Sequence, residues 1–285
     1  IRDSSQYGTK VVSTSIRDAT HVLDEILNNE TELQIFEHTT DTAGYTELIF
    51  AFFDLLGMQF APRIRDIGDQ RIYRPSSRPL SELPHLRHRI SGTIKEKRII
   101  KQWDELLRVA GSLKTGFVTA SLLVQRLQAF PRKNALTKLL QDYGRIAKSI
   151  HILKWYESEV YRRRINTQLN KGEALHSLRS YVRYANRGLV RSCHDDELQN
   201  QAACLNLIVN AIITWNTRYI EAAIRQLKAE GIKVRKEDVR HLWPTRFEHI
   251  NVHGKIRFDI EQEFNREGLR PLRTGEARVT DQLSV

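Results

Sequence analysis

The run of residues 45–56 constrains the fold of this chain more than any other stretch. Its apolar side chains recur at helical spacing and form one broad apolar face, and Gly57 can supply the left-handed residue that ends a helix. Short apolar runs stand before it, at 32–38, and after it, at 59–64, and both predict strands. A strand, a helix and a returning strand together predict an α/β unit.

The remaining elements divide the chain into an α/β part and a helical part. Residues 7–15 predict a further strand and residues 18–28 a helix, whereas the stretch 75–84 is rich in Pro, Ser and Arg and predicts a loop or boundary. Beyond that stretch the periodicity is helical almost throughout. The expected helices cover residues 94–110, 120–129, 136–155, 159–169, 172–186, 197–229 and 237–242.

The charge balance of the chain favours a polyanionic partner. Lys and Arg total 45 against 34 Asp and Glu, which gives a net charge of +11. Nucleic acid is the expected partner, although an anionic membrane surface would also suit this charge. No run approaches the roughly 18 apolar residues of a spanning helix, and no signal sequence is evident, so we expect a cytoplasmic protein. Cys193 and Cys204 lie outside any CxxC or Cys/His cluster, which predicts neither disulfides nor zinc.

Asp41 is the first candidate for a catalytic residue. It falls just past the strand predicted at 32–38, and ligands of open α/β sheets bind beyond the carboxyl ends of strands. An alternative is a turn or N-cap aspartate, because Asp-Thr-Ala-Gly favours a turn. For Asp41 taken alone, the turn is the better interpretation.

Glu173 is the second candidate, because it is the only acid between Tyr161 and Arg191. At helical spacing it points away from the apolar seam that contains Leu175 and Leu178, with His176 on its own face. The alternative is a surface glutamate paired with neighbouring arginines. The basic residues of this region are Arg162, Arg163, Arg164, Lys171, Arg179, Arg183, Arg187 and Arg191.

Two carboxylates in basic surroundings suit two-metal phosphoryl transfer, in which ions about 4 Å apart stabilise the attacking and the leaving oxygen. Asp41 and Glu173 are the candidate ligands, and Mg²⁺ is the ion that oxygen ligands favour, with Mn²⁺ as the alternative. His249 fits a structural histidine better than a site residue, and the four tryptophans are interpreted as core anchors rather than a base-stacking platform. The residues expected to contact DNA phosphates are Arg162, Arg163, Arg164, Lys171, His176, Arg179, Arg183 and Arg187, with a solvated basic face as the alternative.

Several longer motifs resemble one known family. They are EHTTDTAGY at 37–45, FAPR at 60–63, LLRVAGSLK at 106–114, GRIAK at 144–148, YRRRI at 161–165, QLNKGE at 168–173, WNTRY at 215–219 and EHIN at 248–251. In order and across nearly the whole chain, they are similar to the catalytic region of the Tn3-family bacterial transposases. The resemblance implies an RNase H-like fold with a DDE triad of acids, divalent metal, and nicking and strand transfer at transposon ends. Asp41 matches the second acid of that triad and Glu173 the third.

The resemblance also implies a domain plan and an activity. Residues 1–75 would hold the first RNase H-like elements with Asp41, 76–165 a helical insertion, 166–233 the catalytic helices with Glu173, and 234–285 a C-terminal extension. The family's first acid lies upstream of the region that resembles residues 1–15, and Asp3 matches a different aspartate. We therefore expect the chain alone to be inactive and the full-length protein to be a homodimer. The alternative function is an inactive, truncated DNA-binding fragment, and a metal-dependent nuclease would share the same acids.

Overall fold

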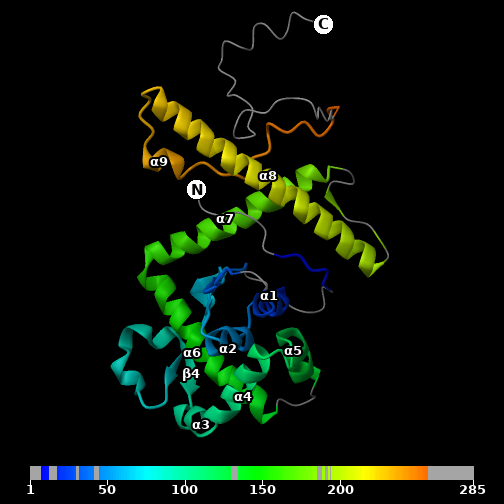
Figure 1. Cartoon of the computed structure of the whole chain (residues 1–285). Helices are drawn as coiled ribbons and strands as arrows, with labels where there is room; N and C mark the ends of the chain where they lie inside the picture. Colours follow the sequence, from blue (N-terminus) through cyan, green and yellow to red (C-terminus); the bar gives the residue numbers. More distant parts are fainter. Residues whose placement is uncertain are drawn as a thin grey trace, which may run out of the picture. The chain divides into compact units, whose positions relative to one another are not determined.

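A computed structural model describes residues 8–12, 18–29, 32–41, 45–129, 134–184, 188, 189, 192 and 194–255. The chain divides into two compact units. One comprises Lys10–Gly172, and the other comprises Ile1–Thr9 with Glu173–Val285. Helix α7 (Glu159–Val182) contributes residues to both units (Figure 1).

The unit 10–172 is a mostly helical α/β structure with two small parallel sheets. One sheet pairs β1 (Glu37–His38) with β2 (Gln59–Phe60), and the other pairs β3 (Ile72–Pro75) with β4 (Ile90–Ile94). The α/β class expected from the sequence is confirmed in this coarse form. The helices of the unit are α1 (Asp18–Leu27), α2 (Glu47–Leu55), α3 (Glu96–Lys101), α4 (Trp103–Lys114), α5 (Ala120–Ala129), α6 (Ala135–Glu157) and the first part of α7.

Helix α2 is the centre of this unit, as its sequence pattern predicts. The Thr46 hydroxyl caps its first turn by accepting from the Ile49 amide at 3.3 Å, and Gly57 follows it with a φ of +76°. Every side chain from Leu48 to Phe53 is buried, which is more than one amphipathic face would bury. Helix α2 is therefore enclosed by its neighbours, and α6 packs along it (Figure 1).

Gly144 permits that close packing of α6 on α2. A Cβ atom at this position would lie 1.7 Å from the Glu47 carbonyl oxygen, so Gly144→Ala must push the two helices apart. We expect it to lower the free energy of unfolding by about 1–3 kcal/mol or more. Gly111→Ala on α4 is the matched control, because a Cβ there meets nothing within 4 Å and should stabilise by up to about 1 kcal/mol. Urea unfolding would measure both, and equal effects would contradict the packing argument.

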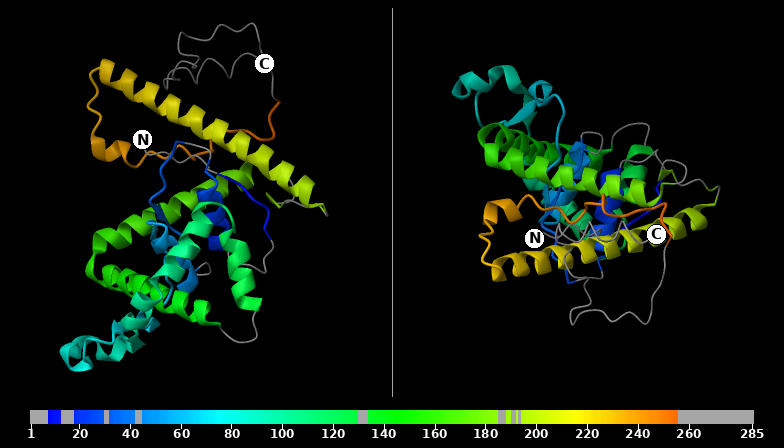
Figure 2. Two further views of the ribbon diagram at one scale, coloured as in Figure 1. Left: turned by 60° about the horizontal axis from the view of Figure 1, so that its bottom comes forward. Right: turned by 90° about the horizontal axis from the view of Figure 1, so that it is seen from above.

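The sheets differ from the sequence prediction. The predicted strands 32–38 and 59–64 shrink to two residues each, although backbone pairing continues past them, and residues 8–12, the described part of 7–15, form no strand. The predicted loop 75–84 begins at the end of β3 and leads toward β4, and the sequence analysis missed both strands because each has only four or five residues. Figure 2 shows the segment 72–94, in cyan, projecting from one end of its unit.

The helices follow the predictions more closely. The expected helix 94–110 is divided into α3 and α4, and only its first residue, Ile94, belongs to strand β4, whereas 159–169 and 172–186 merge into α7. Helix α7 continues through Gly172, where the sequence analysis expected a break. Gly172 is exposed, and a Cβ there would meet nothing within 4 Å. The helices predicted at 18–28, 120–129, 136–155, 197–229 and 237–242 are confirmed to within a few residues.

The second unit packs α7 against the long helix α8 (Asp195–Ala229), followed by the short α9 (Lys236–Val239). Its core consists of Leu178, Leu205, Val209 and Ile213, with Phe247 against them. The predicted seam of α7 is confirmed at Leu178, which is buried, and at Leu175, which is partly buried against the same core. Among the described helices of both units, none is long and apolar enough to cross a membrane.

Candidate functional site

The backbone places Asp41 at the carboxyl ends of two parallel strands. Beyond β1 and β2 the pairing continues, because the Ala61 amide donates to the His38 carbonyl at 2.9 Å and the Arg63 amide to the Thr40 carbonyl at 2.8 Å. Arg63 is thereby held beside Asp41, and its Nη2 lies 3.3 Å from Asp41 Oδ1. The Asp41 side chain is 64 % exposed. Its place just past a strand end agrees with the sequence analysis, and the exposed, arginine-paired carboxylate is accessible to a ligand.

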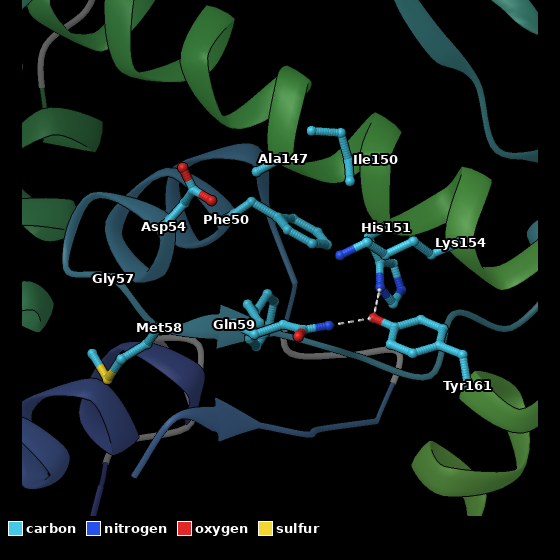
Figure 3. Close-up of a pocket in the computed structure, with 11 residues that line it drawn as sticks. Phe50, Asp54, Gly57, Met58, Gln59, Ala147, Ile150, His151, Lys154 and Tyr161 are labelled. Atoms are coloured by element: carbon cyan, nitrogen blue, oxygen red, sulfur yellow. Dashed lines mark hydrogen bonds between the residues drawn. The ribbon is translucent and has the colours of Figure 1, made fainter. Parts of the chain in front are cut away.

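A hydrogen-bond network fixes β2 against α6 and the start of α7 (Figure 3). The Gln59 amide donates to the Tyr161 hydroxyl at 3.0 Å, and His151 Nδ1 lies 2.8 Å from the same hydroxyl. His151 Nε2 lies 3.0 Å from the Pro62 carbonyl oxygen, which can only accept. His151 therefore carries its proton on Nε2, and Tyr161 donates to Nδ1. Burial lowers the pKa of His151 to about 4, which keeps the ring neutral at pH 7.

This network borders a surface pocket of about 300 Å³ in the same unit. Figure 3 shows Gln59, His151 and Tyr161 turned toward one another, with Phe50 and Lys154 nearby. The sequence analysis missed the network, because Gln59 and Tyr161 stand 102 residues apart and form no motif. Its structural consequence is that the Asp41 strand pair and the base of α7 are joined through buried polar contacts.

His38, the last residue of β1, is also held in an apolar setting. Its ring stacks on Phe53 and Phe60, with centroid distances of 5.6 Å and 6.0 Å. Among the described residues its buried Nε2 has no hydrogen-bond partner. Burial lowers the pKa of His38 to about 4, so this ring is neutral at pH 7 as well.

Glu173 lies on α7 in the second unit and is exposed. Its carbonyl oxygen accepts from the Ser177 hydroxyl at 3.0 Å. The core residue Leu178 is 0 % exposed, so the prediction that Glu173 points away from the apolar seam is confirmed. Beside it, Ala174 and Ser177 line a pocket of about 400 Å³ whose other wall includes Trp243.

The donor chemistry of Asp41 and Glu173 suits a hard divalent cation, because both offer only carboxylate oxygens. They belong to different units. Within the described ranges of the chain, no group of three His, Cys, Asp or Glu side chains is placed to hold a metal. The two acids thus offer suitable ligand atoms for a metal, but the described residues do not bring a complete set of metal ligands together.

Several of the predicted DNA-binding arginines have protein partners that the sequence analysis did not foresee. Arg162 donates to the Trp155 carbonyl at the end of α6. Arg163 pairs with Glu159 at 2.7 Å, and Arg164 pairs with Glu37 at 2.6 Å. Because exposed ion pairs exchange readily for phosphate contacts, the DNA-binding prediction remains a prediction for Arg163 and Arg164.

The remaining predicted basic residues lie along α7. Lys171 is half-buried and His176 is exposed. Burial lowers the pKa of Arg179, and Arg183 donates to the Gln201 side chain at 2.8 Å. Arg187 and Arg191 lie outside the described residues.

Comparison with known proteins confirms the resemblance seen in the motifs. Residues 1–256 match the family described as Tn3 transposase DDE domain. The chain is 41 % identical to the transposase for transposon Tn501 of Pseudomonas aeruginosa over 94 % of its length and 27 % of the relative's. Identity is 44 % with the transposase for transposon Tn2501 of Escherichia coli, over 88 % of this chain and 25 % of the relative.

A third relative, the transposase for transposon gamma-delta of Escherichia coli strain K12, is 36 % identical over 92 % of the chain and 26 % of the relative. The chain therefore spans about a quarter of the length of these curated relatives. By the extent of these matches, the chain belongs to the Tn3 transposase DDE domain family.

Proposed function

We propose that this chain is the catalytic region of a transposase for DNA-mediated transposition, which nicks transposon ends and joins the free 3′-OH to target DNA. The observation that carries the proposal is the family match over residues 1–256, which includes both candidate acids. Transposases act on DNA, and the net charge of +11 suits that partner. The similar proteins are named transposases, so the alternative of an inactive DNA-binding fragment is not favoured.

In this proposal Asp41 and Glu173 are metal-binding acids of an RNase H-like catalytic domain. The DDE transposase family implies a divalent metal, and Mg²⁺ is the ion proposed here, with Mn²⁺ as a substitute. When bound, such ions activate the attacking oxygen and stabilise the leaving one. Arg63 keeps the Asp41 carboxylate beside the strand ends, and the network of Gln59, Tyr161 and His151 holds β2, three residues before Arg63.

The proposed division of labour follows the domain plan expected from the sequence. Residues 1–75 and 166–233 would form the catalytic part, 76–165 an inserted helical part and 234–285 an extension. The protein would act in the cytoplasm as a homodimer. The residues proposed to contact DNA phosphates are Arg162, Arg163, Arg164, Lys171, His176, Arg179, Arg183 and Arg187.

The experiment is a strand-transfer assay with the complete protein that carries this chain. The substrates are DNA with the element's terminal repeats and a target plasmid, incubated with Mg²⁺, with Mn²⁺ or with EDTA. We expect products joined through the 3′-OH of the element in either metal and none in EDTA. Joining that persists in EDTA, or no joining to the target in either metal, would contradict the proposal.

A further inference from the structure

Helix α8 carries a stack of three aromatic rings on its surface. Trp215 and Tyr219, one turn apart, stack with centroids 5.0 Å apart and planes at 16°. The ring of His249 joins them, 5.6 Å from Trp215 and at 21° to it. Trp215 is 42 % exposed, and His249 is exposed as well. The interpretation of Trp215 as a core anchor was therefore wrong.

Buried polar contacts hold the stack in place. The Asn216 side chain, 5 % exposed, donates to the carbonyl oxygens of Pro244 at 2.6 Å and Arg246 at 2.8 Å. The Tyr181 hydroxyl donates to the Ile250 carbonyl at 2.6 Å. His249 stands between these anchored residues, so its ring is fixed against α8 before any ligand arrives.

The stack is not needed to fill the core of its unit. That core is made by Leu178, Leu205, Val209 and Ile213, and Trp215 is not a member of it. At about 100° per residue, Trp215 points nearly opposite to the buried Ile213. Three rings ordered side by side on the surface leave apolar area in water that burial would otherwise stabilise. A ligand that covers the rings would recover that area.

A cation lies beside the rings. Arg218, three residues after Trp215 on α8, is exposed and makes no ion pair with any acid of the described residues. Flat aromatic faces beside a guanidinium group suit unpaired nucleobases and the phosphates that join them. A duplex hides its base faces in its own stack, and the net charge of +11 favours a polyanion over another protein surface. Single-stranded DNA is therefore the partner that the chemistry favours.

We propose that Trp215, Tyr219 and His249 form a stacking platform for unpaired bases of single-stranded DNA, with Arg218 contacting a neighbouring phosphate. The inference deepens the proposed function and rests on it, because a nick leaves a strand end that can separate from its complement, but the platform requires neither Asp41 nor Glu173. An unpaired base extends the stack at the exposed His249 ring or covers the exposed part of Trp215.

The test measures binding of the 285-residue chain to a fluorescein-labelled oligothymidylate and to a duplex of equal length, by anisotropy. Trp215→Ala should weaken single-strand binding about tenfold or more while duplex binding is retained, and Trp215→Phe should keep most of the affinity. Trp103→Ala is the matched control, because Trp103 on α4 is 39 % exposed but lies in the other unit. Circular dichroism establishes that each variant is folded.

Arg218→Gln tests the site without removing a ring. It should reduce the slope of log affinity against log salt by about 0.7 for the single strand. Unchanged single-strand affinity in folded Trp215→Ala, or an equal loss for duplex and single strand, would overturn the platform, as would a change in self-association alone. Acid variants such as Asp41→Asn should bind the oligothymidylate with unchanged affinity. Binding of the single strand therefore tests the platform, whereas strand transfer tests the proposed catalysis.

Discussion

Asp41→Asn and Glu173→Gln, each made in the complete protein that carries this chain, are expected to abolish strand transfer and leave binding to the terminal repeats intact. Each substitution replaces a carboxylate by a neutral amide of nearly the same shape, which binds Mg²⁺ poorly. Loss of one metal-binding acid removes several kcal/mol of transition-state stabilisation, and we expect a rate at least about a thousandfold lower. Joined DNA products measured over time would report the rate.

The structure gives reason to expect folded variants. The side-chain oxygen of Asn in Asp41→Asn can still accept from Arg63. Glu173 is exposed, and the hydrogen bond from Ser177 goes to its backbone carbonyl, which Glu173→Gln leaves unchanged. Asp69→Asn and Glu221→Gln are matched controls, because each replaces an exposed acid of the corresponding unit. Near wild-type strand transfer by either acid variant, or an equal loss in a control, would remove that acid from the proposed site.

The sequence predicts those parts of the structure that depend on local periodicity. Helix α2 follows from its apolar spacing and from Gly57, and the place of Asp41 follows from the strand before it. The pairing of Asp41 with Arg63 could not be predicted in the same way. It depends on the register between β1 and β2, which brings together residues 22 positions apart.

The misses share one physical cause, which is that contacts distant in sequence override local signals. Strands β3 and β4 have only four and five residues, too few for a clear periodicity, so their pairing identifies them. Gly172 weakens a helix by propensity alone, yet α7 continues through it. Trp215 is a large aromatic residue, a type that is usually buried. It is exposed because its unit packs against the opposite face of α8.

The second large expected effect is a decrease in the free energy of unfolding in mild acid, and it also arises from contacts distant in sequence. Burial lowers the pKa of both His38 and His151 from 6.5 to about 4. As the pH falls below 6.5, the unfolded chain binds protons at these rings and the folded chain does not. The free energy of unfolding therefore decreases with pH down to about pH 4, where the folded rings bind protons too. Each histidine should lower the free energy of unfolding by about 2 kcal/mol between pH 7 and pH 5.

Urea unfolding at pH 7, 6 and 5 would measure this decrease in the free energy of unfolding. At these pH values most carboxylates stay ionised, so they contribute little to the pH dependence. Hydrogen bonds from Ser76 and Ser77 hold the pKa of Glu96 well below its usual value of 4.5, so its contribution is lost only at lower pH. His38→Phe keeps an aromatic ring against Phe53 and Phe60 and removes the buried Nε2. His38→Phe should therefore remove about half of the decrease in the free energy of unfolding that the two histidines cause between pH 7 and pH 5.

His85→Gln is the control for that variant, because His85 is exposed and its replacement should leave the pH dependence unchanged. Replacing His151 tests a different contribution. His151→Phe removes its titration but leaves the Pro62 carbonyl and the Tyr161 hydroxyl without their buried partner, so it should destabilise the fold at every pH. If His38→Phe retained the full loss between pH 7 and pH 5, burial of His38 would not be its cause. The pair of variants thus separates the cost of protonating a buried ring from the stabilisation that a satisfied ring provides beside the Asp41 strands.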